Sequence, residues 1–189
     1  MKVPLTKFQK EEYKKILKVK EKFMILGVGQ FIHRKGWDIL LQSSKELADN
    51  IGIYIVGSEP TDEYKKIKTS LGKENIYFEG FKTKEELKKY YMAADLFVLP
   101  TREDIWGLVV NEALSFGVPV ITTKQCIAGN ELVSANNGAL IEGENPSLLA
   151  EVINEIKDKE LSEQCLNIAR NYTIEKMVLA HLTVLDGEK

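Results

Sequence analysis

The first long apolar run of the chain is Phe23-Met24-Ile25-Leu26-Gly27-Val28-Gly29. A short apolar run that ends in glycine is typical of a strand buried on both faces of a parallel sheet. The pattern recurs along the chain, and amphipathic segments with helical spacing alternate with it. We expect strands at 23–29, 51–56, 76–78, 96–99, 118–122 and 138–141. We expect helices at 36–49, 62–71, 83–94, 107–116, 146–157, 162–172 and 173–185. This alternation predicts an α/β fold with a doubly wound, parallel, six-stranded, Rossmann-like sheet.

The composition limits the classes of protein that this chain can belong to. It has 189 residues, of which 44% are hydrophobic and 29% charged, as expected for a single globular domain. A net charge of −2 argues against a nucleic-acid-binding protein. No apolar run is long enough to span a membrane, and the Lys-rich start lacks the apolar core of a signal peptide. We interpret Cys126 and Cys165 as reduced thiols of a cytoplasmic protein.

The segment from residue 100 to residue 113 is unusual for a loop between a strand and a helix. The strand ends at Pro100 and the helix begins near Gly107, so the free N–H groups of residues 106–109 would suit a phosphate. Asp104 and Glu112 would repel a phosphate, but they can accept hydrogen bonds from sugar or ribose hydroxyls. In the alternative interpretation, Asp104 stabilises its helix and Glu112 is a surface residue. The apolar neighbours of Glu112 instead predict a partly buried carboxylate that has a partner.

A second segment, from residue 27 to residue 36, combines two strand-end glycines with two cations. Ile32 stands where a dinucleotide-binding fingerprint needs its third glycine, which disfavours an NAD-dependent dehydrogenase. The Gly-Lys-Ser/Thr of a Walker loop is also missing. Arg34 and Lys35 at the start of the following helix oppose the helix dipole, so an anion such as a diphosphate could compensate them. A solvated basic turn remains an equally open interpretation.

Together these segments resemble the C-terminal, nucleotide-sugar-binding half of a GT-B-fold retaining glycosyltransferase, in the large group called family four. The resemblance covers about residues 22–172 and depends on motifs that occur in the family's order. They are Gly-x5-Lys-Gly at 29–36 and the segments 55–57, 77–81, 94–100, 104–112, 117–121, 131–133 and 137–138. The motif Arg-Glu-Asp-Ile-Trp-Gly at 102–107 is closest to enzymes that make capsule and exopolysaccharide.

The resemblance implies a role for each acidic residue. Glu112 would bind the ribose hydroxyls, Asp104 would hold hydroxyls of the donor sugar, and main chain around Phe81 would receive the base. The family's acidic-x7-Glu element usually opens with Glu, whereas this chain has Asp104 preceded by Glu103. Which of these two carboxylates meets the sugar therefore stays open.

The resemblance also implies a cradle for the diphosphate. Backbone N–H groups of Gly107 and Leu108, together with Lys35, would hold it and stabilise charge on the leaving group. Many relatives carry Arg directly after the first-strand glycine, where this chain has Gln30, so Arg34 is the candidate substitute. The expected catalytic residues are Lys35, Asp104 and Glu112. The expected substrate-binding residues are Gly29, Arg34, Phe81, Glu103, Gly107 and Leu108.

The expected domain organisation follows from the same resemblance. Residues 1–22 would form a linker and a lead-in helix, residues 23–189 the donor-binding domain, and the N-terminal acceptor domain would be absent. The donor would be a UDP- or GDP-sugar, bound without metal or cofactor, and the acceptor a polysaccharide or a lipid-linked sugar. The isolated domain would transfer weakly, because transfer needs donor and acceptor in one geometry. Membrane contact would be possible only for the full-length enzyme. The alternative is a non-catalytic nucleotide-sugar-binding module.

Overall fold

The centre of the protein is a parallel six-stranded sheet. The computed structural model describes residues 3–173, 176, 178–179 and 182–183. The strands are β1 (Phe23–Val28), β2 (Ile51–Val56), β3 (Ile76–Phe78), β4 (Leu96–Leu99), β5 (Val120–Thr123) and β6 (Gly138–Ile141). Their order is β3-β2-β1-β4-β5-β6, and each neighbouring pair runs parallel. The chain reverses its direction of winding between β1 and β4, as in Rossmann folds. The predicted fold class is confirmed.

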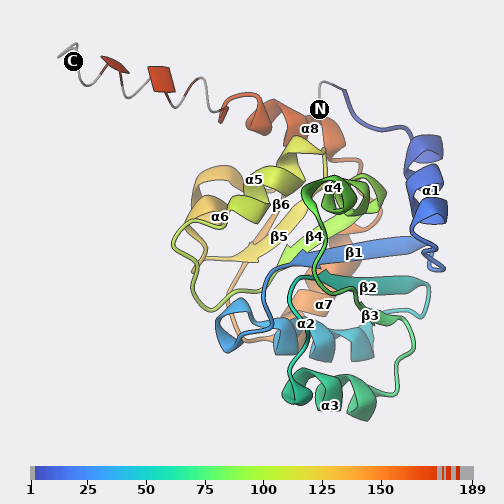
Figure 1. Ribbon diagram of the computed structural model, residues 1–189. Helices are drawn as coiled ribbons and strands as arrows, with labels where there is room; N and C mark the ends of the chain where they lie inside the picture. The colour runs from blue at the N-terminus through green and yellow to red at the C-terminus, as the bar shows by residue number, and fades with distance from the viewer. Residues whose placement is uncertain (1–2, 174–175, 177, 180–181, 184–189) are drawn as a thin grey trace.

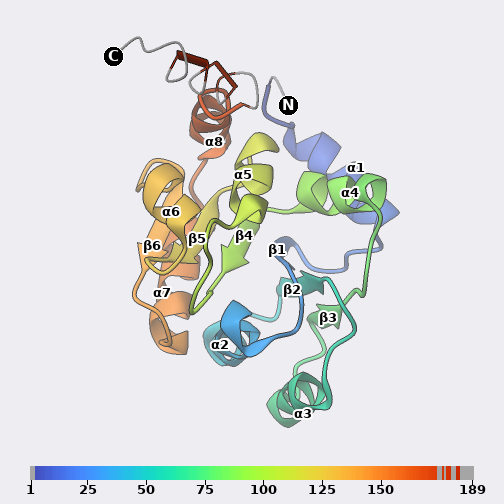
Figure 2. The same ribbon diagram turned by 60° about the vertical axis from the view of Figure 1, so that its left-hand side comes forward.

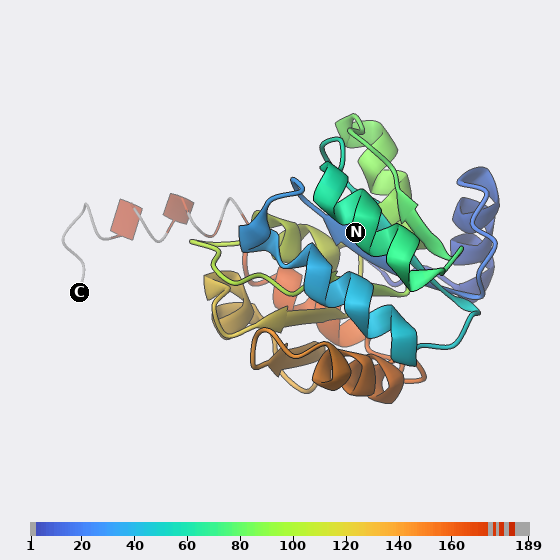
Figure 3. The ribbon, with the colours of Figure 1, turned by 90° about the horizontal axis from the view of Figure 1, so that it is seen from below.

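Helices cover both faces of the sheet. They are α1 (Lys7–Ile16), α2 (Trp37–Ser43), α3 (Asp62–Leu71), α4 (Lys84–Ala93), α5 (Leu108–Ser115), α6 (Ile127–Leu132), α7 (Pro146–Ile156) and α8 (Ser162–Ala169). Helices α2, α3 and α7 lie side by side across one face (Figure 3). Helices α4, α5 and α8 lie on the other face (Figure 1). Figure 2 shows α1 beside α4 and α8 beside α5.

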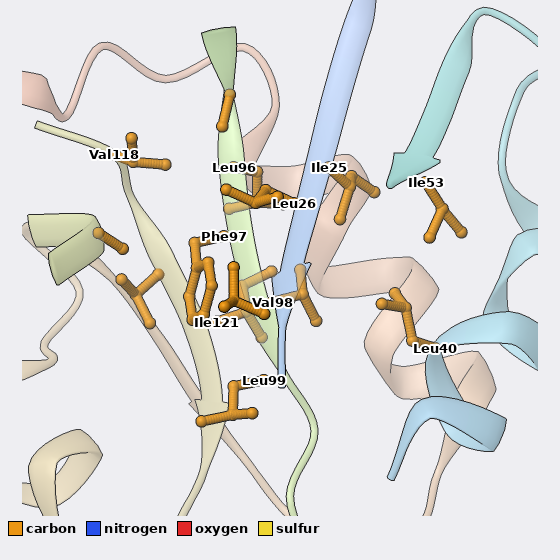
Figure 4. Packing of buried hydrophobic residues seen from close by; sticks show 14 of the residues in the cluster. Ile25, Leu26, Leu40, Ile53, Leu96, Phe97, Val98, Leu99, Val118 and Ile121 are labelled. Carbon is orange, nitrogen blue, oxygen red and sulfur yellow. The ribbon is translucent and has the colours of Figure 1, made fainter. Parts of the chain in front are cut away.

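The apolar runs of the sequence become the buried strands. Side chains of the central strands, among them Ile25, Phe97 and Ile121, fill the space between sheet and helices (Figure 4). Trp37 of α2 packs so closely against β1 that a Cβ on Gly27 would lie 2.9 Å from its ring. The Trp37 indole N–H donates to the Gln30 carbonyl at 2.9 Å. The core therefore fixes the loop that leaves β1 as well as the strand.

Some element boundaries differ from the predicted ones. Helix α2 ends at Ser43, six residues early, because the hydroxyls of Ser43 and Ser44 donate back to carbonyls and a 3₁₀ turn follows. Strand β5 begins at Val120 because Pro119 has no N–H to donate to the ladder. The six-residue helix α6 was missed. Helix α8 ends at Ala169, and much of the helix expected at 173–185 lies outside the described residues.

Helix α1 is joined to the sheet through a buried lysine. The buried Lys14 bonds to the Asp95 carboxylate and the Lys22 carbonyl, both at 2.7 Å from Nζ. Asp95 in turn accepts from the Met24 N–H at 2.8 Å, which joins α1 to the start of β1. Within the described residues, no helix has the length and apolarity that crossing a membrane requires.

Candidate functional site

The loops at the carboxyl ends of the strands form a continuous edge, in the order of the strands themselves. The N–H of Gly57, after β2, donates to the Gly80 carbonyl, after β3, at 3.0 Å. On its other side Gly57 approaches the loop after β1, where a Cβ would lie only 1.9 Å from the Gly29 carbonyl oxygen. Only glycine fits there. The β3, β2 and β1 loops therefore touch through their main chains.

The loop after β4 continues this edge between its two neighbours. The Arg102 N–H and the Thr101 hydroxyl both donate to the Arg34 carbonyl at 2.8 Å, which joins the β4 loop to the β1 loop. On the other side, the Asp104 N–H donates to the Gln125 carbonyl at 3.1 Å, in the loop after β5. The two segments that the sequence singled out are thus neighbours in space.

Lys35 and Asp104 form an ion pair at the centre of this edge. Lys35 Nζ lies 2.6 Å from Asp104 Oδ2, and the two side chains are only 14% and 11% exposed. Arg34 and Lys35 were expected at the start of the helix that follows β1, and they directly precede α2. They lie in a 3₁₀ turn, His33–Lys35, that is separated from α2 by Gly36 in a left-handed conformation. The turn therefore places Lys35 beside the β4 loop, and not along the axis of α2.

Arg102 fixes the turn that carries Lys35. Its guanidinium donates two bonds to Asp38, at 2.9 and 2.7 Å, and a third to the His33 carbonyl at 2.8 Å. Burial would raise the pKa of Asp38, but the bonds and charge of Arg102 outweigh it and hold this pKa below its usual value. The bonds to Asp38 raise the pKa of Arg102. This clamp was not predicted from the sequence, although Arg102 opens the motif at residues 102–107.

The N-terminus of α5 lies beside the ion pair. Gly107 precedes the helix with φ +91°, and a Cβ there would lie 2.6 Å from Cys126 Sγ and 3.8 Å from the Asp104 carboxyl carbon. The N–H groups of Gly107, Leu108 and Val109 have no hydrogen-bond partner within the described part of the chain. These N–H groups and the Lys35–Asp104 pair thus meet at one place, where the family resemblance implies a cradle for a diphosphate.

Glu112 occupies the second turn of α5. The expectation that it is partly buried is wrong, because the side chain is exposed. Val110, Ala113 and Leu114 turn toward the core on one side of the helix, and Glu112 projects from another. The expected partner exists: the Tyr91 hydroxyl donates to Glu112 Oε2 at 2.8 Å. Burial and the neighbouring carboxylate raise the pKa of Tyr91 well above its usual value.

The remaining predicted residues contribute less through their side chains. Glu103 is exposed, and its main-chain carbonyl accepts from Arg34 Nη1 at 3.3 Å. Gly29 lies against the stem of Lys35, with 3.4 Å between its Cβ position and Lys35 Cε. Phe81 is 83% exposed in the loop between β3 and α4. The structure therefore brings the predicted residues of the β1 and β4 loops together. Phe81 follows β3, which is two strands away from β1 in the sheet.

Comparison with known proteins gives the family. The family model described as glycosyl transferases group 1 matches residues 8–172. The chain belongs to this family. An uncharacterized 41.2 kDa protein in the cps region of Klebsiella pneumoniae is 32% identical over 157 residues, covering 80% of this chain and 42% of that protein. The alpha-galactosylglucosyldiacylglycerol synthase of Streptococcus pneumoniae is 28% identical, with 82% and 43% covered. This glycosyl transferase chain spans less than half the length of these relatives.

Solved structures show the same architecture. Escherichia coli WaaG is also among the curated relatives, at 27% identity. The crystal structure of WaaG, a glycosyltransferase involved in lipopolysaccharide biosynthesis, matches with a TM-score of 0.75 over 89% of this chain and 47% of its own, at 24% identity. HepE of Anabaena, in complex with UDP, matches with a TM-score of 0.85 over 97% of this chain and 54% of its own, at 22% identity. The predicted half of a GT-B fold is therefore confirmed.

Proposed function

We propose that this chain is the donor-binding half of a glycosyltransferase and binds a nucleoside-diphosphate sugar at the carboxyl edge of the sheet. The observation that carries the proposal is the meeting of the Lys35–Asp104 pair with the unpartnered N–H groups of α5. Such N–H groups carry partial positive charge and favour an anion. The binding of UDP by HepE, a structural neighbour, supports a diphosphate donor here.

The ion pair fits the binding of a diphosphate next to a sugar. Lys35 has three N–H donors, and its bond to Asp104 uses one of them, so the others are available to phosphate oxygens. Asp104 keeps acceptor capacity for a sugar hydroxyl. In this arrangement Lys35 and the α5 N–H groups stabilise negative charge that develops on the leaving diphosphate. Arg34 and the main chain at Gly29 flank the same position.

Glu112 fits the recognition of the ribose. It lies four residues after Leu108, so the two residues share a face of α5. A nucleotide whose diphosphate meets the N–H groups of Gly107 and Leu108 would place its ribose one turn along the helix. The base would then lie toward the main chain around Phe81. Glu103, exposed beside Asp104, is a second candidate partner for the sugar hydroxyls.

We further propose that transfer retains the anomeric configuration, needs no metal or cofactor and uses a polysaccharide or lipid-linked acceptor. The acceptor side of the reaction would belong to another domain, so this chain alone would transfer weakly. Cys126 and Cys165 are both buried free thiols, which fits a reducing compartment such as the cytoplasm.

Isothermal titration calorimetry with UDP, GDP, ADP and their sugars tests the proposal. We expect binding to one nucleotide class that EDTA leaves unchanged. Glu112→Ala should weaken it by about 1–3 kcal/mol, because ribose hydroxyls lose a charged partner. Lys35→Met should also weaken it, whereas Glu155→Gln, an exposed control on α7, should not. A folded chain that binds none of these nucleotides would refute the proposal.

A further inference from the structure

Tyr91 is a buried side chain that reaches the candidate site from another helix. It lies near the end of α4, and only 2% of it is exposed. Its ring stacks on Phe116 with 5.4 Å between centroids and 3° between planes, and packs against Phe97 of β4 at 6.0 Å. Rings packed on two sides occupy a single position. The hydroxyl of Tyr91 is therefore held at a fixed point beside α5.

The hydrogen bond from Tyr91 constrains a carboxylate that would otherwise move freely. Glu112 is exposed, and the Tyr91 hydroxyl is its only side-chain partner within the described residues. A free Glu side chain samples many rotamers, and ordering such a side chain on binding reduces affinity. The bond orders the carboxylate in advance. Because Oε2 accepts this bond, Oε1 and the remaining lone pairs stay available to a ligand.

We propose that Tyr91 is a positioning residue that presents the Glu112 carboxylate to the ribose diol of the donor nucleotide. The proposal rests on the function proposed above and adds a residue that does not itself touch the ligand. A vicinal diol offers two donors about one carboxylate width apart, so its recognition depends on how the carboxylate is turned. The hydrogen bond from Tyr91 fixes the orientation of the Glu112 carboxylate relative to the free N–H groups of α5, which lie one helical turn away. Recognition of ribose is then preorganised before the nucleotide arrives.

The test compares two nucleotides in three proteins. UDP and 2′,3′-dideoxy-UDP are titrated calorimetrically into the wild-type chain, Tyr91→Phe and Tyr54→Phe. Tyr54 is the matched control: it is also buried, and its hydroxyl donates to a glutamate, Glu21, which precedes β1 at the opposite edge of the sheet. We expect Tyr91→Phe to weaken UDP binding about three- to tenfold, the usual effect of ordering one side chain. Dideoxy-UDP, which has no diol, should bind both variants as it binds the wild type.

The outcomes separate this proposal from the function on which it rests. Equal weakening of UDP and dideoxy-UDP by Tyr91→Phe would assign Tyr91 a general packing role and overturn the proposal. No weakening by Tyr91→Phe, while Glu112→Ala weakens UDP binding, would overturn the proposal alone. A folded chain that binds none of UDP, GDP and ADP would overturn the donor-binding function itself. In Tyr91→Phe/Glu112→Ala, a loss equal to that of Glu112→Ala supports the proposal, and an additive loss contradicts it.

Discussion

Arg102→Met should lower the denaturant concentration at the midpoint of unfolding. Methionine keeps much of the side-chain volume but loses the charge, the three bonds to Asp38 and the His33 carbonyl, and the bond to the exposed Glu144 at 3.0 Å. The Arg102 and Asp38 side chains are 16% and 23% exposed, so their ion pair is intermediate between a solvent-exposed pair and a buried one. Asp38 would keep its charge with no cation beside it.

The magnitude follows from this exposure. Solvent-exposed ion pairs contribute about 0–1 kcal/mol, and removing one partner of a buried pair costs about 3–5 kcal/mol. We therefore expect Arg102→Met to lower the free energy of unfolding by about 2–3 kcal/mol. For a chain of this length the midpoint of thermal unfolding should then fall by about 5–10 °C. Asp38→Asn in the Arg102→Met background should cost little more, because the uncompensated charge is gone.

Urea unfolding followed by circular dichroism measures this change, with an unchanged m-value as evidence that the unfolding reaction is the same. Lys124→Met is the matched control, since Lys124 pairs with Glu142 on the surface, where both side chains are more than half exposed. Lys124→Met should shift the midpoint of urea unfolding by less than a quarter of the shift that Arg102→Met causes. The reasoning fails if Arg102→Met and Lys124→Met shift it equally, or if Arg102→Met and Asp38→Asn are additive.

Three further predictions concern stability and reactivity. Gly36→Ala should destabilise the fold by more than about 3 kcal/mol in urea unfolding, since φ is +69° and its Cβ would lie 2.0 Å from the Pro100 carbonyl oxygen; a loss under 1 kcal/mol would contradict this. The wild type should lose stability as pH falls below about 4, because the pKa of Asp38 is lower in the folded than in the unfolded state. Asp38→Asn should show a smaller slope, and equal slopes would count against the clamp. Burial raises the pKa of the Cys126 thiol and that of Cys165, the latter to about 12. Both thiols should therefore react with a disulfide reagent at pH 8 only in urea. Reaction in the native state would show that the thiols are accessible and contradict this prediction.

The sequence predicted the sheet well because its strands are buried on both faces. Such strands are continuous apolar runs, and residues 51–56 need no tertiary information to be recognised. Helix lengths were less predictable. The end of α2 depends on two serines whose hydroxyls bond back to carbonyls, and α6 is too short to show helical periodicity. Local hydrogen bonds thus decided the boundaries that apolar spacing did not.

The site was predictable as a set of loops but not as a set of contacts. The ends of parallel strands meet at one edge, so Lys35 and Asp104 could be expected near each other although 69 positions separate them. The partner of Arg102 could not be predicted, because it depends on the path of the 3₁₀ turn before α2. Burial of Glu112 was judged from its sequence neighbours, yet adjacent residues on a helix face different directions.

The pairing of Lys35 with Asp104 has a consequence for the rate at which ligands arrive. Two opposite charges 2.6 Å apart cancel at long range, and the field of such a dipole falls off faster than that of a lone cation. An approaching polyanion therefore gains little attraction from Lys35 until it is in contact. Capture of a nucleotide would then depend only weakly on ionic strength, and the selectivity of this edge would arise after encounter, when phosphate and carboxylate share one ammonium group.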